Sequence, residues 1–190
     1  MNTVEEKIIN ATLSCIEKYG INKTTIRQIG QEADVNSAAI NYYFRSKDIL
    51  MEQAMNAALH NAFNIDDFKA SESLPIKERL ISIMDELTAG ALKFPNITKA
   101  YFTELMEKND YNLPIVKSCN KFFTELEQEI KNSYPEMKST DIKMVLMQLT
   151  SSTFLFLGLF PGFYIGFPEV DVTNAKVRRD YVEKLVNKLL

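Results

Sequence analysis

Residues 36 to 42 of this 190-residue chain combine small side chains with side chains that form hydrogen bonds. On a helix beginning near Asn36, the exposed face would hold Ser37, Ala38, Asn41 and Tyr42. Such side chains can enter the major groove of DNA without filling it with charge. The Asn41 carboxamide can donate to and accept from one adenine edge, and the Tyr42 hydroxyl can reach a phosphate. This pattern indicates base recognition.

Three further side chains are placed to contact a phosphate backbone. Thr25 and Arg27 stand at the start of one predicted helix, and Lys47 stands at the start of another. A helix N-terminus favours anions, and phosphate contacts fix the position of a protein on DNA. The predicted DNA-binding residues are therefore Thr25, Arg27, Asn36, Ser37, Ala38, Asn41, Tyr42 and Lys47.

Local signals place these residues on two short helices joined by a turn. Residues 25–33 begin with Thr25 and Gln28 at the spacing of a capping box, and the next helix begins with Asn36 or Ser37 as its cap. Two short helices separated by about four residues have the geometry of a helix-turn-helix unit. The apolar residues that would pack between them are Ile26, Ile29, Ala33, Val35 and Ile40.

Helical signals continue through the rest of the chain, and strand signals are nearly absent. Residues 64–74 predict a linker, and residues 161–172 predict a loop rich in glycine, proline and phenylalanine. The sequence predicts an all-α fold of about nine helices, with a three-helix DNA-binding domain at 1–46 and a larger helical domain at 47–190. The expected helices span about 3–19, 25–33, 37–43, 47–63, 75–93, 95–108, 114–134, 141–160 and 174–190.

The composition is that of an ordinary soluble protein, with 46% hydrophobic residues, 25% charged residues and a net charge of −3. Residues 20–47 hold four basic and two acidic side chains, so a DNA-binding surface must be local. The two cysteines lack metal-ligand or disulfide-framework spacing, and the N-terminus is too acidic for a secretory signal. The uncharged stretch 144–168 is broken by polar residues and by Pro161, so its apolar run is too short to span a bilayer. We expect a cytoplasmic protein without a membrane span, metal or cofactor.

The N-terminal quarter of the chain has a glycine, Gly20, that ends the first helix, the Thr24-Thr25 pair, the aromatic run Tyr42-Tyr43-Phe44 and the Ser46-Lys47 step. In these features it resembles the signature of the TetR repressor family. The resemblance covers about residues 8–51. Because many spaced elements agree at once, the resemblance is specific.

Four positions depart from the family pattern. The family usually has alanine at Gly30, and glycine in a helix costs about 0.5–1 kcal/mol relative to alanine. It usually has glycine at Asp34, which must therefore enter a left-handed conformation. Asn36 replaces serine but caps a helix equally well. Asn41 replaces a tyrosine that commonly touches DNA in the family, so its base contact is a hypothesis about this protein.

The resemblance implies a homodimer that binds a palindromic operator in double-stranded DNA, with two recognition helices about one DNA turn apart. It also implies a C-terminal domain that binds a small-molecule effector and thereby releases the operator. The helices at about 141–160 and 174–190 would form the dimer interface. On the last helix, an apolar stripe would face the second copy: Val177, Tyr181, Leu185 and Lys188-Leu189. The outer edge of that helix would carry Arg178, Arg179 and Lys184.

The aromatic and methionine residues of the larger domain suit both an apolar pocket and an ordinary core. His60 is the only histidine, and no second histidine, cysteine pair or carboxylate cluster accompanies it at metal-ligand spacing. The 161–172 loop would either wrap onto a partner subunit or cover a pocket mouth. The candidate ligand-binding residues are His60, Phe102, Phe122, Met144, Met147 and Phe154.

Taken together, these features predict a DNA-binding transcriptional regulator, specifically a repressor released by a small apolar or aromatic ligand. A helical-bundle enzyme and an interaction module without DNA binding are the alternatives. The sequence has no nucleophile–base pair, phosphate loop or metal set, so we predict that the protein is not an enzyme.

Overall fold

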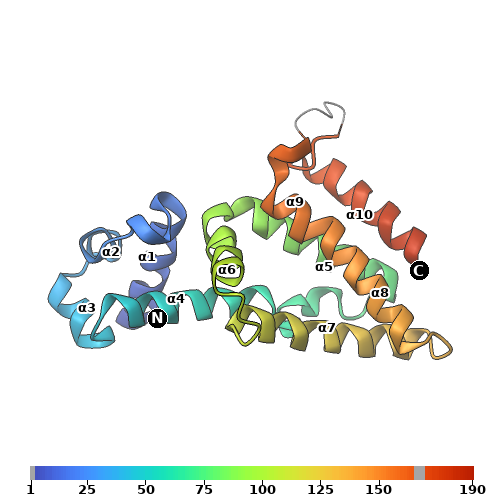
Figure 1. Cartoon of the computed structure of the whole chain (residues 1–190), viewed down its shortest axis with the longest axis horizontal. Coiled ribbons are helices and arrows are strands. Elements are labelled where there is room, and N and C mark those ends of the chain that lie inside the picture. The colour runs from blue at the N-terminus through green and yellow to red at the C-terminus, as the bar shows by residue number, and fades with distance from the viewer. Residues whose placement is uncertain (1–2, 165–169) are drawn as a thin grey trace. The chain divides into compact units, whose positions relative to one another are not determined.

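The computed structural model describes residues 3–164 and 170–190. These residues form helices joined by short connections, with no strand among them (Figure 1). When α8, the π-helical turn after it and α9 are counted as one interrupted helix, the described residues contain nine α-helices. The predicted all-α fold class is confirmed.

The chain packs as two compact units. The first unit comprises Met1–Asn61 and Phe94–Ile115, and the second comprises Ala62–Lys93 and Val116–Leu190. The predicted DNA-binding domain, residues 1–46, falls within the first unit, which also includes residues that were assigned to the larger domain.

The first unit is built from helices whose starts are set by local caps. Thr3, Thr25 and Asn36 each accept a hydrogen bond from a backbone N–H three residues later. Gly20 ends the first helix with a φ of 82°, a conformation that glycine adopts at little cost. The elements are α1 (Val4–Tyr19), a 3-10 turn (Ile21–Lys23), α2 (Ile26–Ala33), α3 (Ser37–Phe44), α4 (Lys47–Ala62) and α6 (Pro95–Lys108).

Helices α1, α2 and α3 surround a small apolar core. On α2, the Glu32 carboxylate accepts hydrogen bonds from Ser14 Oγ at 2.8 Å and from Lys18 Nζ at 2.8 and 2.9 Å, both on α1. The hydrogen bond from Lys18 holds the pKa of Glu32 below its ordinary value, so this connection remains charged at neutral pH. The buried members of the core are Ile8, Ala11, Cys15, Ile29, Ile40, Phe44 and Leu50.

The second unit is organised around α5, which packs against α9, the π-helical turn and α10. A Cβ added at Gly158 of α9 would lie 2.5 Å from the Cβ of Ala91 on α5, so these two helices approach very closely. The elements are a 3-10 segment (Ile65–Ser71), α5 (Ile76–Lys93), α7 (Pro114–Ser133, which begins in the first unit), α8 (Ser139–Thr150), the π-helical turn (Ser151–Leu155), α9 (Phe156–Leu159), a 3-10 turn (Pro161–Tyr164) and α10 (Ala175–Leu189).

The predicted linker at residues 64–74 is largely 3-10 helical instead. Arg79 on α5 is 4% exposed, and its Nη1 donates to the carbonyl of Phe68 at 2.9 Å and to Ser71 Oγ at 3.1 Å. The same guanidinium forms an ion pair with Glu129 at 2.5 Å. Because a buried guanidinium must have its donors satisfied, it orders the segment that supplies the acceptors.

The helix predicted to run to residue 160 is interrupted by the π-helical turn. The hydroxyls of Thr150, just before this turn, and of Thr153, inside it, donate to carbonyls four residues earlier, at 2.8 and 2.6 Å, and such bonds distort helices. The segment Ser139–Leu159 is long and apolar enough to cross a membrane by length and composition alone, but half of its most apolar window is buried inside the protein. Of the predicted 161–172 loop, residues 165–169 lie outside the described residues.

Helix α10 begins after the predicted cap Asn174, but one prediction for its surface is wrong. The sequence predicts Arg178 on the outer edge of the helix, whereas the residue is only 7% exposed. Its Nε lies 2.7 Å from Asp85 Oδ1 on α5. The face of α10 that α5 covers is therefore Arg178, Val182 and Val186, one position along from the stripe Val177, Tyr181 and Leu185.

Candidate nucleic-acid interface

The start of α2 has the predicted capping box. Thr25 Oγ1 accepts from the backbone N–H of Gln28 at 3.3 Å, and Gln28 Oε1 accepts from the backbone N–H of Thr25 at 2.7 Å. The Thr25 hydroxyl also donates to Gln28 Oε1 at 2.8 Å. Two orphan donors of the helix are thus satisfied within four residues, which fixes where α2 begins and leaves Arg27 exposed in its first turn.

The turn between α2 and α3 adopts the predicted left-handed conformation at Asp34, with a φ of 53° and a ψ of 48°. The backbone N–H groups of Asp34 and Val35 both donate to the carbonyl of Gly30. A Cβ at Gly30 would lie 2.8 Å from the carbonyl oxygen of Val35. The glycine therefore lets the turn fold back closely over the last turns of α2.

Helix α3 presents one buried face and one exposed face. Asn36 Oδ1 caps the helix by accepting from the backbone N–H of Ala39 at 2.8 Å. Ile40 and Phe44 are each 1% exposed and anchor the helix in the core. The opposite face brings together four predicted DNA-binding residues, all of them exposed: Ser37, Ala38, Asn41 and Tyr42.

Tyr42 is the large aromatic side chain of this exposed face. It is 82% exposed, and its ring meets that of Tyr43 edge-on, with centroids 5.3 Å apart and an interplanar angle of 88°. Tyr43 thus limits the positions that the Tyr42 ring can take. No sequence signal had singled out this supporting role of Tyr43.

The connection from α3 to α4 is a tight turn at Arg45. Arg45 has a φ of 62°, and the Ser46 backbone N–H donates to the Phe44 carbonyl at 2.6 Å. Ser46 Oγ then caps α4 by accepting from the Ile49 N–H at 3.2 Å, as predicted. Lys47, the first residue of α4, is half-buried. Positive φ at an arginine has no reliable sequence signature, so the strained turn was missed.

The six candidate ligand-binding residues are divided between the two units. His60 and Phe102 belong to the first unit, and the other four belong to the second. Phe122 and Phe154 are buried, and the ring of Phe63 meets both, with centroids 5.9 and 5.7 Å away. The side chains of Met144 and Met147 instead lie on the exposed surface of α8, because the buried face of that helix is Ile142, Val145, Leu146 and Leu149.

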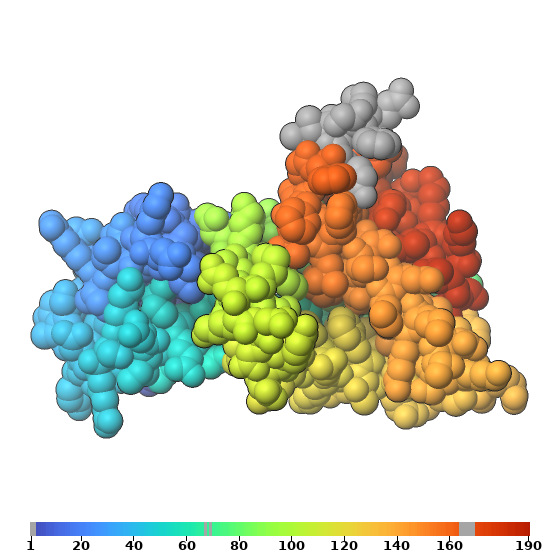
Figure 2. Space-filling model, viewed as in Figure 1, coloured from blue at the N-terminus to red at the C-terminus, as the bar shows by residue number. Residues whose placement is uncertain are grey.

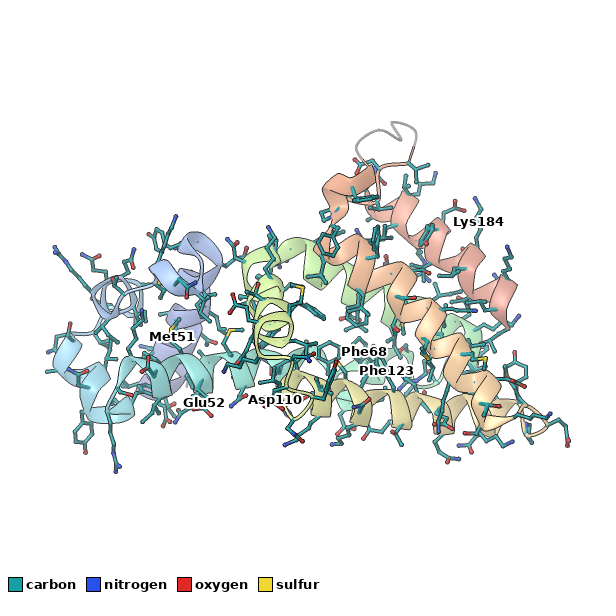
Figure 3. All side chains as sticks on the ribbon, in the orientation of Figure 1. Met51, Glu52, Phe68, Asp110, Phe123 and Lys184 are labelled. Atoms are coloured by element: carbon teal, nitrogen blue, oxygen red, sulfur yellow. The ribbon has the colours of Figure 1, made fainter. Side chains whose placement is uncertain are left out.

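An open hollow of about 930 Å³ lies within the first unit. Met51 and Glu52, adjacent on α4 (Figure 3), line it together with residues of the Ile21–Lys23 turn and of α6. None of the candidate ligand-binding residues contributes to this hollow. Among the residues that the structure describes, no group of three or more histidine, cysteine or acidic side chains is placed to hold a metal ion.

A capped helix-turn-helix on an all-helical chain defines a class of DNA-binding regulators. The family model for bacterial regulatory proteins of the tetR family matches residues 8–54. The chain is 31% identical over 185 residues to the HTH-type transcriptional regulator BetI of Vibrio vulnificus, covering 94% of this chain and 90% of that protein. It is 33% identical over 187 residues to BetI of Burkholderia thailandensis, covering 95% and 92%. The chain belongs to the TetR family of transcriptional regulators.

The fold is shared with solved structures at low sequence identity. A TetR transcription regulator from Haloarcula marismortui superposes with a TM-score of 0.66 over 97% of both chains, at 17% identity. The architecture of both units is therefore that of the family.

Proposed function

We propose that the protein is a homodimeric, cytoplasmic repressor that binds a palindromic operator and leaves it when a small apolar or aromatic effector binds. The exposed face of α3 is the observation that carries the proposal. Its side chains hydrogen-bond or are small, and none is charged. A surface of this kind suits base contacts in a major groove.

Each residue of the interface has a proposed role. Asn41 contacts a base edge from the exposed face of α3, while Ser37 and Ala38 allow that face to approach the groove closely. Tyr42 reaches a phosphate or sugar. Arg27 at the start of α2 and Lys47 at the start of α4 contact phosphates. The Thr25 and Asn36 side chains already cap helices, so they contribute by fixing the helix starts and by offering their remaining polar atoms to the backbone of the DNA.

The exposed faces of α8 and α10 support the proposed dimer. Met144 and Met147 are 59% and 69% exposed on α8. The Val177, Tyr181 and Leu185 stripe of α10 is half-exposed, and the Tyr181 hydroxyl donates to the Ser152 carbonyl at 3.1 Å, which joins α10 to the π-helical turn that follows α8. An apolar surface spread over two adjacent helices fits a four-helix interface with a second copy.

The aromatic cluster of the second unit supports an apolar or aromatic effector. Phe68 packs against Phe122 with ring centroids 5.8 Å apart, and the ring of Phe123 also meets that of Phe122, with centroids 6.1 Å apart. Phe122 and Phe154 are almost fully buried, so an effector would have to displace rings. Such rearrangement is how binding energy can change the balance between two conformations.

The test is a fluorescence anisotropy titration against a duplex selected in vitro from a random library, with a scrambled duplex beside it. We expect preferential binding of the selected duplex, with affinity that falls steeply as salt rises. Absence of binding to any duplex at low salt would contradict the proposal. A mass measurement in solution and an effector screen on the assembled complex then test the dimer and the release separately.

A further inference from the structure

The N-terminus of α6 has no cap from its own neighbourhood. Pro95 is its first residue and has no backbone N–H, and the preceding Phe94 has no side-chain acceptor. The Thr98 N–H bonds to the Phe94 carbonyl at 3.0 Å. The N–H groups of Asn96 and Ile97 are therefore the donors of this first turn that need an acceptor from elsewhere.

Glu17 of α1 supplies that acceptor. Its carboxylate accepts from the Asn96 N–H at 3.1 and 3.3 Å and from the Ile97 N–H at 3.1 Å. Its backbone carbonyl accepts from Asn96 Nδ2 at 2.8 Å. A carboxylate in this position is also stabilised by the helix dipole. The partners are 79 and 80 residues apart in sequence, so the start of α6 is completed only when it meets α1.

A second connection joins α6 to α4. The Tyr101 hydroxyl donates to the backbone carbonyl of Met55. Burial raises the pKa of Tyr101, so the hydroxyl keeps its proton and remains a donor. Helix α6 is thus tied to α1 through its first turn and to α4 through its middle, and α1 and α6 are packed together (Figure 2).

Helices α2 and α3 follow α1 and precede α4 in the sequence, and all four helices contribute to one buried core. Ile8 and Cys15 of α1 and Leu50 of α4 share one buried cluster with Ile29 of α2 and with Ile40 and Phe44 of α3. A change in the angle between α1 and α4 would therefore move the buried side chains against which α3 packs. The connections from α6 act on that angle.

We propose that α6 is part of the DNA-binding apparatus and that Glu17 and Tyr101 are positioning residues for operator binding. By joining α1 to α4 through α6, they fix how the exposed face of α3 is presented. This inference rests on the proposed function only in taking α3 as the element that contacts the operator. Neither side chain is required to touch DNA.

The experiment compares the full-length protein with Glu17→Ala, Glu17→Gln and Tyr101→Phe on the selected and scrambled duplexes across a salt series. We expect Glu17→Ala and Tyr101→Phe to lower operator affinity by about tenfold, the scale of losing hydrogen bonds to a charged or buried group. Affinity for scrambled DNA and the salt slope should stay unchanged, because no phosphate contact is lost. Glu17→Gln keeps an acceptor oxygen and should restore most of the affinity.

Glu5→Ala is the matched control, since it removes the same charge from an exposed position in the first turn of α1. The inference is overturned if Glu17→Ala and Tyr101→Phe bind the operator as Glu5→Ala does, or if they lose both duplexes in proportion to a loss of folded protein. If Glu17→Ala does not fold, Tyr101→Phe makes the same comparison. Wild-type protein that shows no preference for the selected duplex would overturn the proposed function itself, whereas variants that keep the wild-type preference overturn this inference alone.

Discussion

At the scale of single residues, the turn between α2 and α3 depends on a missing side chain. Both N–H groups of the turn donate to the Gly30 carbonyl, and the Val35 carbonyl oxygen lies only 2.8 Å from where a Cβ at position 30 would be. Asp34 adopts the left-handed conformation at a free-energy cost of roughly 1 kcal/mol, and aspartate adopts this conformation more readily than most residues. This turn can therefore accept a side chain at 34 more readily than at 30.

Gly30→Ala and Gly90→Ala should have opposite effects on stability. Gly90 in α5 has open space around its Cβ position, so alanine there should raise the free energy of unfolding by about 0.5–1 kcal/mol. At Gly30 the contact with a backbone oxygen should outweigh that gain and lower the free energy of unfolding. Urea denaturation followed by circular dichroism measures both values. Equal stabilisation by the two substitutions would show that the turn has room for a Cβ.

Asn41→Ala and Lys47→Ala should separate base contacts from phosphate contacts. Loss of the carboxamide should weaken binding to the selected duplex by about 1–3 kcal/mol and leave binding to scrambled DNA unchanged. Loss of the ammonium should weaken binding to both duplexes alike and reduce the salt slope by about one. Anisotropy titrations at several salt concentrations give both quantities. Equal effects of the two variants on both duplexes would refute this division of roles.

At the scale of elements, α10 has two apolar stripes with different partners. Val182 and Val186 are fully buried together with Arg178, whose ion pair with Asp85 anchors the helix to α5. The neighbouring stripe at Val177, Tyr181 and Leu185 is only half-buried within one chain. A helix with apolar residues over so wide an arc is typical of one that is covered on two sides.

The double substitution Met144→Glu and Met147→Glu should convert the proposed dimer to a monomer. Both side chains are mostly exposed in the single chain, so the fold should tolerate the change, whereas two carboxylates in an apolar interface would each be desolvated. Multi-angle light scattering reports the mass. Met106→Glu on α6, where the methionine is 71% exposed, is the control and should remain dimeric. A double variant with the dimer mass would place the interface elsewhere.

At the scale of the whole molecule, a net charge of −3 provides no overall electrostatic attraction to DNA. Affinity must therefore come from a local surface, and the proposed dimer presents that surface twice. Two α3 helices related by a two-fold axis match two half-sites about one DNA turn apart. Spacing between the half-sites should then matter as much as their sequence.

Inserting about five base pairs between the half-sites of the operator should abolish tight binding. The insertion turns one half-site about half a turn to the opposite side of the duplex, where the second α3 cannot reach it. Anisotropy should show affinity falling towards that of a single half-site, because only one α3 of each dimer can then contact the duplex. Unchanged affinity would indicate that each chain binds its half-site independently.

The sequence by itself determined the local units of the site. The Thr25–Gln28 capping box, the Asn36 cap, the Gly20 stop and the left-handed Asp34 are all present as predicted. Each depends on hydrogen bonds or backbone preferences within about four residues, so the information lies in short stretches of chain. The exposed face of α3 follows from the same helical periodicity.

Only the tertiary structure decided which helical faces are covered. Periodicity could not show that Arg178 faces α5, that Met144 and Met147 face outward, or that His60 and Phe102 lie in a different unit from Phe122. Nor could it show that Glu17 completes the start of α6. In each case the residue that covers or contacts the side chain is far away in the sequence. Which of several apolar stripes becomes buried is therefore known only from the packing of the helices. The helix-turn-helix can thus be predicted from short stretches of sequence, whereas its contacts with the rest of the first unit are known only from the tertiary structure.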